Sequence, residues 1–346
     1  MPVGGAEDLA LGVYPYLAPD VSAQFVCLRK LDVLGEEALD KGLPVKLLPF
    51  FLTKRINPLA VWRFSRWLRQ ERITVLHTQT YQAHIFGCAA AMIARVSLVI
   101  HQQKTLANLP WRKKVLFRWC LNRARIIITL TEKTRAQINK EYFISSSIIK
   151  VVPNAIDDRI FYSVSDKANA RRALGLQEDG FLFGTVASLH KVKNHRIIID
   201  ALALSNTKAN LVFVGDGVER KNLECLAKDR GVAERVLFAG HQRPVEPWFQ
   251  ALDTFILASI WEGQPLAMLQ AVSCGLPILA SRIEGNIAVV GEFHCGLFDS
   301  SSPTALASLM NAVMEEPSRF LACHAKVATC KEAATILKTI YSEAQL

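Results

Sequence analysis

The residues best suited to chemistry lie in segment 259–265, which reads Ser-Ile-Trp-Glu-Gly-Gln-Pro. A predicted strand ends at Leu257, and Pro265 is placed to open a helix as its first residue. The first turn of a helix presents free N–H groups and the positive end of the helix dipole, and this arrangement binds phosphate. The carboxylate of Glu262 in the same loop can accept hydrogen bonds from sugar hydroxyls. The alternative is an ordinary strand–turn–helix with a solvated acid.

Together with residues 266–277, this segment resembles the E-x7-E region of the family 4 retaining glycosyltransferases, which have the GT-B fold. The resemblance implies that Glu262 contacts hydroxyls of the donor sugar. It also implies that the backbone of the residues after Glu262 faces the sugar and diphosphate; these are Gly263, Gln264, Pro265 and Leu266. Gln270 replaces the second acid of the pattern, which would bind the ribose diol. An amide offers one acceptor oxygen where a carboxylate accepts two charge-assisted bonds, so we expect weaker nucleotide binding.

A second match lies in residues 186–195, which resemble the V-G-R-L-x-x-x-K pattern of the same family. The basic residues of that pattern neutralise the donor diphosphate as it leaves. Lys193 matches the lysine, Ser188 stands in place of the arginine, and Lys191 is the candidate substitute for it. The alternative for both lysines is a solvated loop, which is the commoner fate of lysine. Gly215 lies in a Val-Gly-Asp-Gly turn that resembles another motif of the family.

Two further segments resemble the family with departures. Residues 282–290 match its G-G-x-P-E-V-V segment, with Ile287 and Ala288 in place of proline and glutamate. Glu284 either supplies a nearby acid or is simply exposed. Residues 153–157 match its P-N-G-I/V-D signature with alanine for glycine. The order and spacing of the matches, over about residues 150–300, make a chance resemblance improbable.

The first half of the chain offers glycines and histidines. Gly4 and Gly5 belong to a Gly-Gly-Ala-Glu sequence that resembles the family's first loop, where glycines let an acceptor or phosphate approach the backbone. His77 and His101 each end a predicted strand, and the carboxyl ends of strands in open α/β sheets face the ligand crevice. The resemblance implies that His101 contacts the donor sugar or developing charge, which places it with Glu262 and Lys193 in the catalytic set. His77 is either an acceptor-side ligand or a satisfied structural histidine.

The elements that must position these residues alternate along the chain. Short apolar runs predict strands at 24–28, 73–77, 98–101, 126–130, 149–152, 181–186, 210–214, 236–239, 254–257 and 277–280. Amphipathic stretches at 59–69, 111–123, 196–204 and 266–274 predict helices between them. This rhythm is typical of parallel sheets with crossover helices and predicts an α/β chain of two doubly wound, Rossmann-like domains.

We expect an acceptor-binding domain at 1–160 and a nucleotide-sugar-binding domain at 161–318. A tail at 319–346, helical from Arg319 to Tyr341, is expected to pack back on the first domain. The family's first loop follows a buried central strand, and this sequence begins at the loop. The first domain is therefore expected to lack its first strand, and we favour a true start upstream over a damaged copy.

The charge of the chain is uneven. Of a formal net charge of +10, the whole excess lies in residues 1–165, which hold 23 Lys and Arg against 12 Asp and Glu. Segments 62–69 and 110–123 mix aromatic and cationic residues at helical spacing, which favours contact with an anionic membrane surface. The alternatives are core-facing tryptophans and a merely solvated surface. We expect no nucleic-acid partner, because no nucleic-acid-binding motif is present.

The combined hypothesis is a hexosyltransferase that acts with retention. It would move a hexosyl group from a nucleoside diphosphate sugar to a glycolipid or cell-envelope polysaccharide precursor of the lipopolysaccharide type. The resemblance implies that neither a cofactor nor a metal is needed. No apolar run approaches the ~20 residues of a membrane span, so we expect a cytoplasmic protein, peripheral on the inner face of the cytoplasmic membrane. The alternative, favoured by Ser188, Gln270 and Ala288, is a degenerate family member that binds without transferring.

Overall fold

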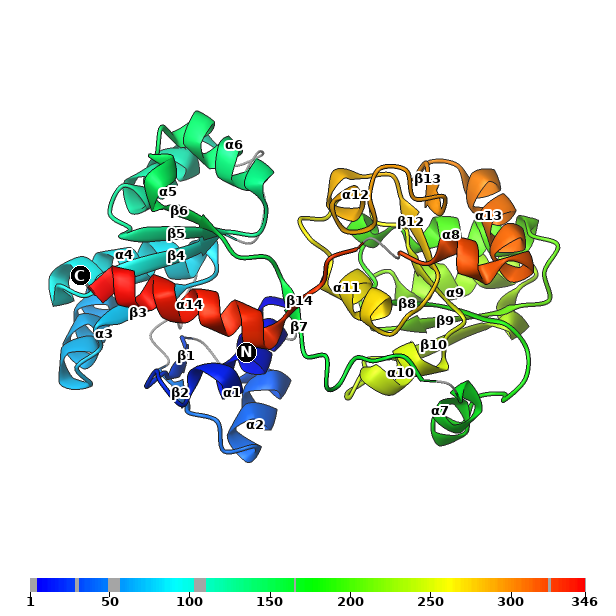
Figure 1. Ribbon diagram of the computed structural model, residues 1–346, viewed down its shortest axis with the longest axis horizontal. Helices are drawn as coiled ribbons and strands as arrows, with labels where there is room; N and C mark the ends of the chain where they lie inside the picture. Colours follow the sequence, from blue (N-terminus) through cyan, green and yellow to red (C-terminus); the bar gives the residue numbers. More distant parts are fainter. Residues whose placement is uncertain are drawn as a thin grey trace. The chain divides into compact units, whose positions relative to one another are not determined.

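The computed structural model describes residues 5–28, 31–48, 57–102, 110–164, 166–322 and 325–345. The chain divides into two compact units, each built around a parallel sheet (Figure 1). Unit 1 comprises Met1–Ala155 and Ala328–Leu346, and unit 2 comprises Ile156–Val327. The chain therefore leaves unit 2 after residue 327, not after residue 318.

Unit 1 alternates strands and helices. Its strands are β1 (Phe25–Cys27), β2 (Val45–Leu47), β3 (Val75–Thr78), β4 (Ser97–Gln102), β5 (Ile126–Thr129) and β6 (Ile149–Val151). Its helices are α1 (Gly5–Leu17), α2 (Asp32–Asp40), α3 (Pro58–Gln70), α4 (Tyr81–Ala94), α5 (Trp111–Leu121), α6 (Glu132–Tyr142), the 3-10 turn η1 (Ser146–Ile148) and α14 (Cys330–Gln345). Two short strands, β7 (Ala155–Ile156) and β14 (Ala328–Thr329), pair with each other.

The sheet of unit 1 is parallel in the order β3-β4-β5-β6, and both of its faces are covered. Alternate residues of β4 and β5 enter different cores. Ile100 and Ile127 pack with α4 and α5, whereas Val99 and Ile128 pack with α1 and α14. This explains why the strands read as continuous apolar runs. Within the described residues, β1 and β2 pair only with each other.

The C-terminal helix begins later than the sequence indicated. The prediction of a helix from Arg319 is wrong, because only the short turn η4 (Pro317–Phe320) forms there and Leu321 is extended. Helix α14 begins at Cys330 behind a capping box: Glu332 N donates to Thr329 Oγ1 at 3.2 Å, and Thr329 N donates to Glu332 Oε2 at 2.8 Å. Figure 1 shows α14, in red, along the sheet of unit 1.

Unit 2 is a second parallel sheet covered by helices. Its strands are β8 (Leu182–Val186), β9 (Asn210–Val214), β10 (Val236–Gly240), β11 (Thr254–Leu257), β12 (Ile278–Ser281) and β13 (Leu297–Phe298). Its helices are α7 (Lys167–Ala173), α8 (His195–Leu204), α9 (Arg220–Asp229), α10 (Glu246–Ala251), α11 (Leu266–Ser273), α12 (Glu284–Val290) and α13 (Pro303–Glu315), with the 3-10 turns η2 (Lys191–Lys193) and η3 (Ala233–Arg235).

The strand order of unit 2 is β10-β9-β8-β11-β12-β13. The order reverses between β8 and β11, so this is the topological switch point at which open α/β sheets bind ligands. One core lies under α8 and α13 and another under α10 and α11. All ten predicted strands are present, and so are the four helices predicted at 59–69, 111–123, 196–204 and 266–274, with ends that differ by at most two residues. The sequence missed β2, β7, β13 and β14, which are two or three residues long.

Candidate active site

Two loops of unit 2 meet at the switch point. One follows β8 and carries Lys193, and the other follows β11 and carries Glu262. The strands are hydrogen-bonded neighbours, and Ile260 N donates to Val192 O at 2.8 Å. The fold therefore brings both sequence motifs to the same carboxyl edge of one sheet.

The predicted lysine and acid are in direct contact. Lys193 Nζ lies 2.5 Å from Glu262 Oε1, and their side chains are only 23% and 12% exposed. The contact is a charge-assisted hydrogen bond between the two loops, with both side chains largely shielded from solvent. Lys193 and Glu262 thus neutralise each other in this ion pair.

A polar network that the sequence analysis did not single out supports Glu262. Ser259 Oγ donates to Glu262 Oε1 at 2.7 Å. Ser281 Oγ, at the end of β12, donates to Ser259 O at 2.5 Å, and Asn286 Nδ2 donates to Ser281 O at 2.8 Å. Ser259, Ser281 and Asn286 are fully buried. Only Ser259 had a sequence signal, as the serine of the Ser-x-x-Glu-Gly-x-Pro pattern.

Helix α12 packs closely against the Glu262 loop through a glycine. A Cβ atom added at Gly285 would lie 2.4 Å from Glu262 O and 2.9 Å from Gly263 O. A real Cβ is never found that close to a carbonyl oxygen, so glycine is required at this contact. Glu284 and Ala288, on the same helix, are exposed.

Helix α11 begins in this loop with an uncapped first turn. Pro265 is its N-cap residue, and no side chain caps the helix there. The N–H groups of the first turn have no intrahelical acceptor, so they are available to an anion. The resemblance implied that the backbone of residues 263–266 faces the sugar and diphosphate. Pro265 has no N–H group, so it cannot donate a backbone hydrogen bond there. Gly263, Gln264 and Gln270 are half-buried.

The remaining donor-side predictions lie around the loop after β8. Ser188 and Lys191 are exposed. Gly215 has φ +139°, and a Cβ there would lie 2.1 Å from Ala187 O. The lack of a side chain at Gly215 thus lets the turn after β9 approach the loop after β8 this closely. His195 Nε2 donates to Ser188 O at 3.2 Å, and burial lowers the pKa of His195 to about 4.

In unit 1 the predicted histidines lie together. The His77 and His101 ring centroids are 5.4 Å apart at the ends of β3 and β4. His84, which the sequence analysis did not name, is also buried, and its Nδ1 shares a 2.8 Å hydrogen bond with Thr78 Oγ1. Burial lowers the pKa of His77 to about 4 and that of His101 well below its usual value. All three imidazoles are therefore neutral at physiological pH.

The comparisons with known proteins agree with this geometry. Residues 166–334 match the family described as "Glycosyl transferases group 1", and residues 3–159 match "Glycosyltransferase Family 4". The chain is 30% identical over 265 residues to the UDP-Gal:alpha-D-GlcNAc-diphosphoundecaprenol alpha-1,3-galactosyltransferase of Escherichia coli, which covers 71% of this chain and 67% of the relative. This chain belongs to the family 4 glycosyltransferases.

Other relatives of this glycosyltransferase are matched over less of their length. The 2-deoxystreptamine glucosyltransferase of Streptomyces kanamyceticus is 30% identical over 213 residues, which is 59% of this chain and 55% of that protein. Among solved structures, Anabaena Alr3699/HepE in complex with UDP and glucose has a TM-score of 0.84 at 20% identity, covering 98% of this chain and 96% of its own. These likenesses confirm the GT-B fold of two Rossmann-like domains.

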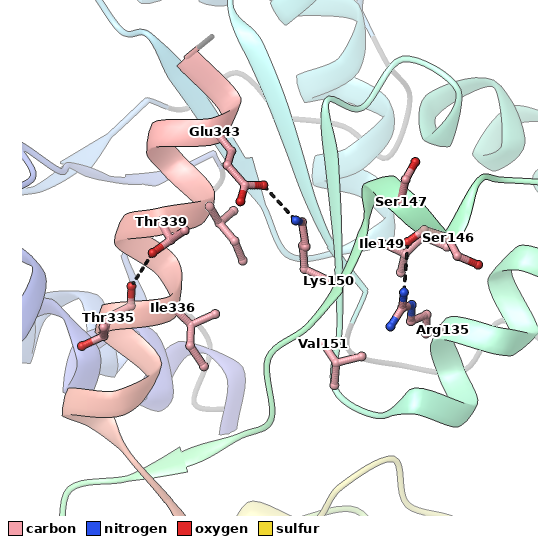
Figure 2. Close-up of a pocket in the computed structure, with 11 residues that line it drawn as sticks. Arg135, Ser146, Ser147, Ile149, Lys150, Val151, Thr335, Ile336, Thr339 and Glu343 are labelled. Carbon is pink, nitrogen blue, oxygen red and sulfur yellow. Dashed lines mark hydrogen bonds and ion pairs between the residues drawn. The ribbon is translucent and has the colours of Figure 1, made fainter.

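A separate groove lies in unit 1 between α14 and the segment from α6 to β6 (Figure 2). Its volume is about 440 Å³, and Lys150 and Glu343 form an ion pair of 2.9 Å across it. It contains none of the predicted site residues of the glycosyltransferase. Of the predicted glycine loop, Gly5 begins helix α1, and Gly4 lies outside the described residues.

Within the described ranges no group of three or more His, Cys, Asp or Glu side chains is placed to hold a metal ion. No described helix is both long and apolar enough to cross a membrane.

Proposed function

We propose that this glycosyltransferase moves a hexosyl group from a nucleoside diphosphate sugar to a glycolipid or cell-envelope polysaccharide precursor, with retention of configuration. The observation that carries the proposal is the Lys193–Glu262 pair at the switch point of unit 2. Glu262 would accept hydrogen bonds from hydroxyls of the donor sugar. Lys193 and the first turn of α11 would stabilise the diphosphate as the glycosidic bond to it breaks.

The nature of the acceptor is supported by the relatives. One acts on a sugar linked to diphosphoundecaprenol, and two more are O-antigen biosynthesis glycosyltransferases of Escherichia coli. A lipid-linked acceptor is presented at a membrane surface, so we place the enzyme in the cytoplasm, peripheral on the inner face of the cytoplasmic membrane. His101 would contact the donor sugar, and His77 would contact the acceptor.

We propose that transfer needs no metal, because cationic side chains and helix N–H groups supply the positive charge at the leaving diphosphate. The chemical test is transfer in the presence of excess EDTA, which should leave the rate unchanged. A rate that depends on added Mg²⁺ or Mn²⁺ would contradict this part of the proposal.

The first test of the function is calorimetric titration of the purified protein with UDP and GDP in parallel. Micromolar to millimolar binding of one nucleotide is expected and would identify the base. Transfer is then measured from the matching nucleotide sugars to a short-chain N-acetylglucosaminyl diphospholipid, with the anomeric configuration of the product read by NMR. A folded chain that binds neither nucleotide would instead favour a degenerate family member.

A further inference from the structure

Tyr341, on the C-terminal helix, contacts a histidine at a strand end of the sheet in unit 1. Its Oη lies 2.7 Å from Nδ1 of His77, and the two rings meet edge to face with centroids 5.8 Å apart. The residues are 264 positions apart in the sequence. The contact therefore exists only because α14 packs on the sheet that carries β3.

The position of α14 on this sheet is fixed at several points around Tyr341. Ala333, Ala334, Leu337 and Ile340 of the helix are buried in one core with Val99 and Ile128 of the sheet. Glu343 pairs with Lys150 of β6 at 2.9 Å (Figure 2), and Gln345 Nε2 donates to Thr74 Oγ1 at 3.0 Å. Lys338 pairs with Asp20 on the other side of the helix. These contacts lie on α14 both before and after Tyr341, so the helix holds the tyrosine hydroxyl in a fixed position against the sheet.

The ionisation of the two groups leaves two arrangements of this hydrogen bond: Tyr341 Oη–H donates to His77 Nδ1, or His77 Nδ1–H donates to Tyr341 Oη. Burial raises the pKa of Tyr341, so its hydroxyl keeps its proton, and burial lowers the pKa of His77, so the imidazole is neutral. A neutral imidazole has one N–H and one lone pair. In the first arrangement, where Tyr341 Oη–H donates to Nδ1, the proton of His77 lies on Nε2.

In that arrangement the Nε2–H group of His77 has no acceptor among the described residues. Nε2 is buried and has no hydrogen-bond partner among the described residues, and the same is true of both ring nitrogens of His101. His101 is only 4% exposed. Two buried imidazoles with unused N–H groups and one unused lone pair, 5.4 Å apart, match a hydroxyl oxygen that accepts one hydrogen bond and donates another.

We infer that Tyr341 is a positioning residue: its hydroxyl holds His77 as the Nε2–H tautomer, and that N–H group donates to an oxygen of the acceptor. The inference rests on the proposed function for the acceptor, but the tautomer itself does not depend on it. Without the tyrosine hydroxyl, Nδ1 becomes a competing site for the proton, and the donor at Nε2 is lost for part of the population.

The tautomer is measured directly in protein labelled with [15N]histidine. Long-range ¹H–¹⁵N spectra at neutral pH should show His77 with an unprotonated Nδ1 and a protonated Nε2, assigned by the loss of its signals in His77→Gln. In Tyr341→Phe, a measurable Nδ1–H population should appear. Protonated Nδ1 in the unmodified protein, or an unchanged tautomer in Tyr341→Phe, would overturn the inference whether or not the chain transfers sugar.

The link to the acceptor is measured with the short-chain N-acetylglucosaminyl diphospholipid. Tyr341→Phe should raise its KM about tenfold, the loss expected for one hydrogen bond to a buried donor, with kcat little changed. In the His77→Gln background the same substitution should add nothing, because the glutamine amide does not need the tyrosine. Equal effects in both backgrounds would show that Tyr341 acts only through the packing of α14.

Tyr142→Phe is the matched control, because its hydroxyl is also buried in unit 1 but has no hydrogen-bond partner among the described residues. It should change neither the tautomer of His77 nor the KM of the acceptor. A tenfold rise in KM for Tyr142→Phe would attribute the effect to the loss of any buried hydroxyl and would contradict the positioning role. An absence of transfer in the unmodified protein would refute the proposed function while leaving the tautomer measurement decisive.

Discussion

Lys193 Nζ and Glu262 Oε1 are 2.5 Å apart, although 69 residues separate them in the sequence. The ion pair joins the loops after β8 and β11, the two strands between which the sheet order of unit 2 reverses. In the proposed function both charges would change partners when a donor binds, because Glu262 would bind sugar hydroxyls and Lys193 would bind the diphosphate. The ion pair therefore holds the two groups close to the positions that the proposed function assigns to them.

The first prediction concerns this lysine. Lys193→Ala should lower kcat roughly 10²–10³-fold, as for removal of one preorganised group that stabilises developing charge. It also leaves Glu262 without its cation, so the melting temperature should be recorded alongside the rate. Lys191→Ala, in the same turn, tests the other candidate lysine, whose side chain is exposed, and should cost less activity than Lys193→Ala. A larger loss for Lys191 than for Lys193 would reverse the assignment.

A second prediction concerns Gln270 on α11. Gln270→Glu should tighten binding of the nucleoside diphosphate by about tenfold to a hundredfold, because a carboxylate makes stronger bonds to the ribose diol than an amide does. Gln270 is half-buried in the second turn of α11. Titration calorimetry of both proteins with the same nucleotide measures the change. An identical dissociation constant for the two proteins would contradict a contact between residue 270 and the ribose.

The third prediction uses His195, which is buried with a pKa of about 4. Desolvation is the main cause of the shift. The unfolded chain protonates near pH 6.5, so it binds more protons than the folded chain between pH 6.5 and 4, and stability falls as the pH drops through that window. The loss by pH 5 is about 2 kcal/mol for this histidine.

Urea unfolding at pH 7.5 and pH 5 tests this dependence. His195→Gln should lose about 2 kcal/mol less than the unmodified protein between the two pH values. His190→Gln is the control, since that side chain is exposed in the neighbouring turn. A pH dependence that is the same in all three proteins would show that His195 is not held neutral by the fold.

The sequence was sufficient for features that depend on local pattern. Strands such as β5 and β9 are buried on both sides and read as unbroken apolar runs, and the motifs around Glu262 and Lys193 sit at strand ends where the topology brings them together. The start of α14 was also readable, because Thr329 and Glu332 have the spacing of a capping box, but the apolar periodicity from Arg319 misled the prediction.

Contacts between distant segments were not readable. No local pattern connects the residues of the hydrogen-bond series that links Ser259, Ser281 and Asn286. The same holds for the hydrogen bond between Tyr341 and His77. Their chemistry depends on the packing of α12 and α14 against sheets formed elsewhere in the chain. The basic aromatic segments gave a mixed result for the same reason: Trp62 and Trp111 are exposed, whereas Phe64 and Phe117 are in the core.

The last prediction concerns the membrane surface proposed for unit 1. Helices α3, α4 and α5 pack side by side, on the face of the sheet away from α14. Large apolar side chains are exposed on them, and these are Leu59, Trp62, Met92, Ile93, Trp111, Val115 and Leu116. Exposed cations lie among them; these are Arg63, Arg66, Arg112, Lys113 and Arg118. Aromatic side chains next to cations are the composition that enters an anionic lipid interface.

Flotation with liposomes of increasing phosphatidylglycerol content measures this contact. The unmodified protein should bind more as the anionic fraction rises, and salt should weaken the binding. Replacing both Trp62 and Trp111 by serine should reduce binding to liposomes about tenfold, because neither side chain can then be buried in the lipid interface. Phe293→Ser is the control, because Phe293 is 95% exposed but belongs to unit 2. If Phe293→Ser weakens flotation as much as the tryptophan variant does, or if anionic lipid has no effect, the helical face of unit 1 is not the docking surface.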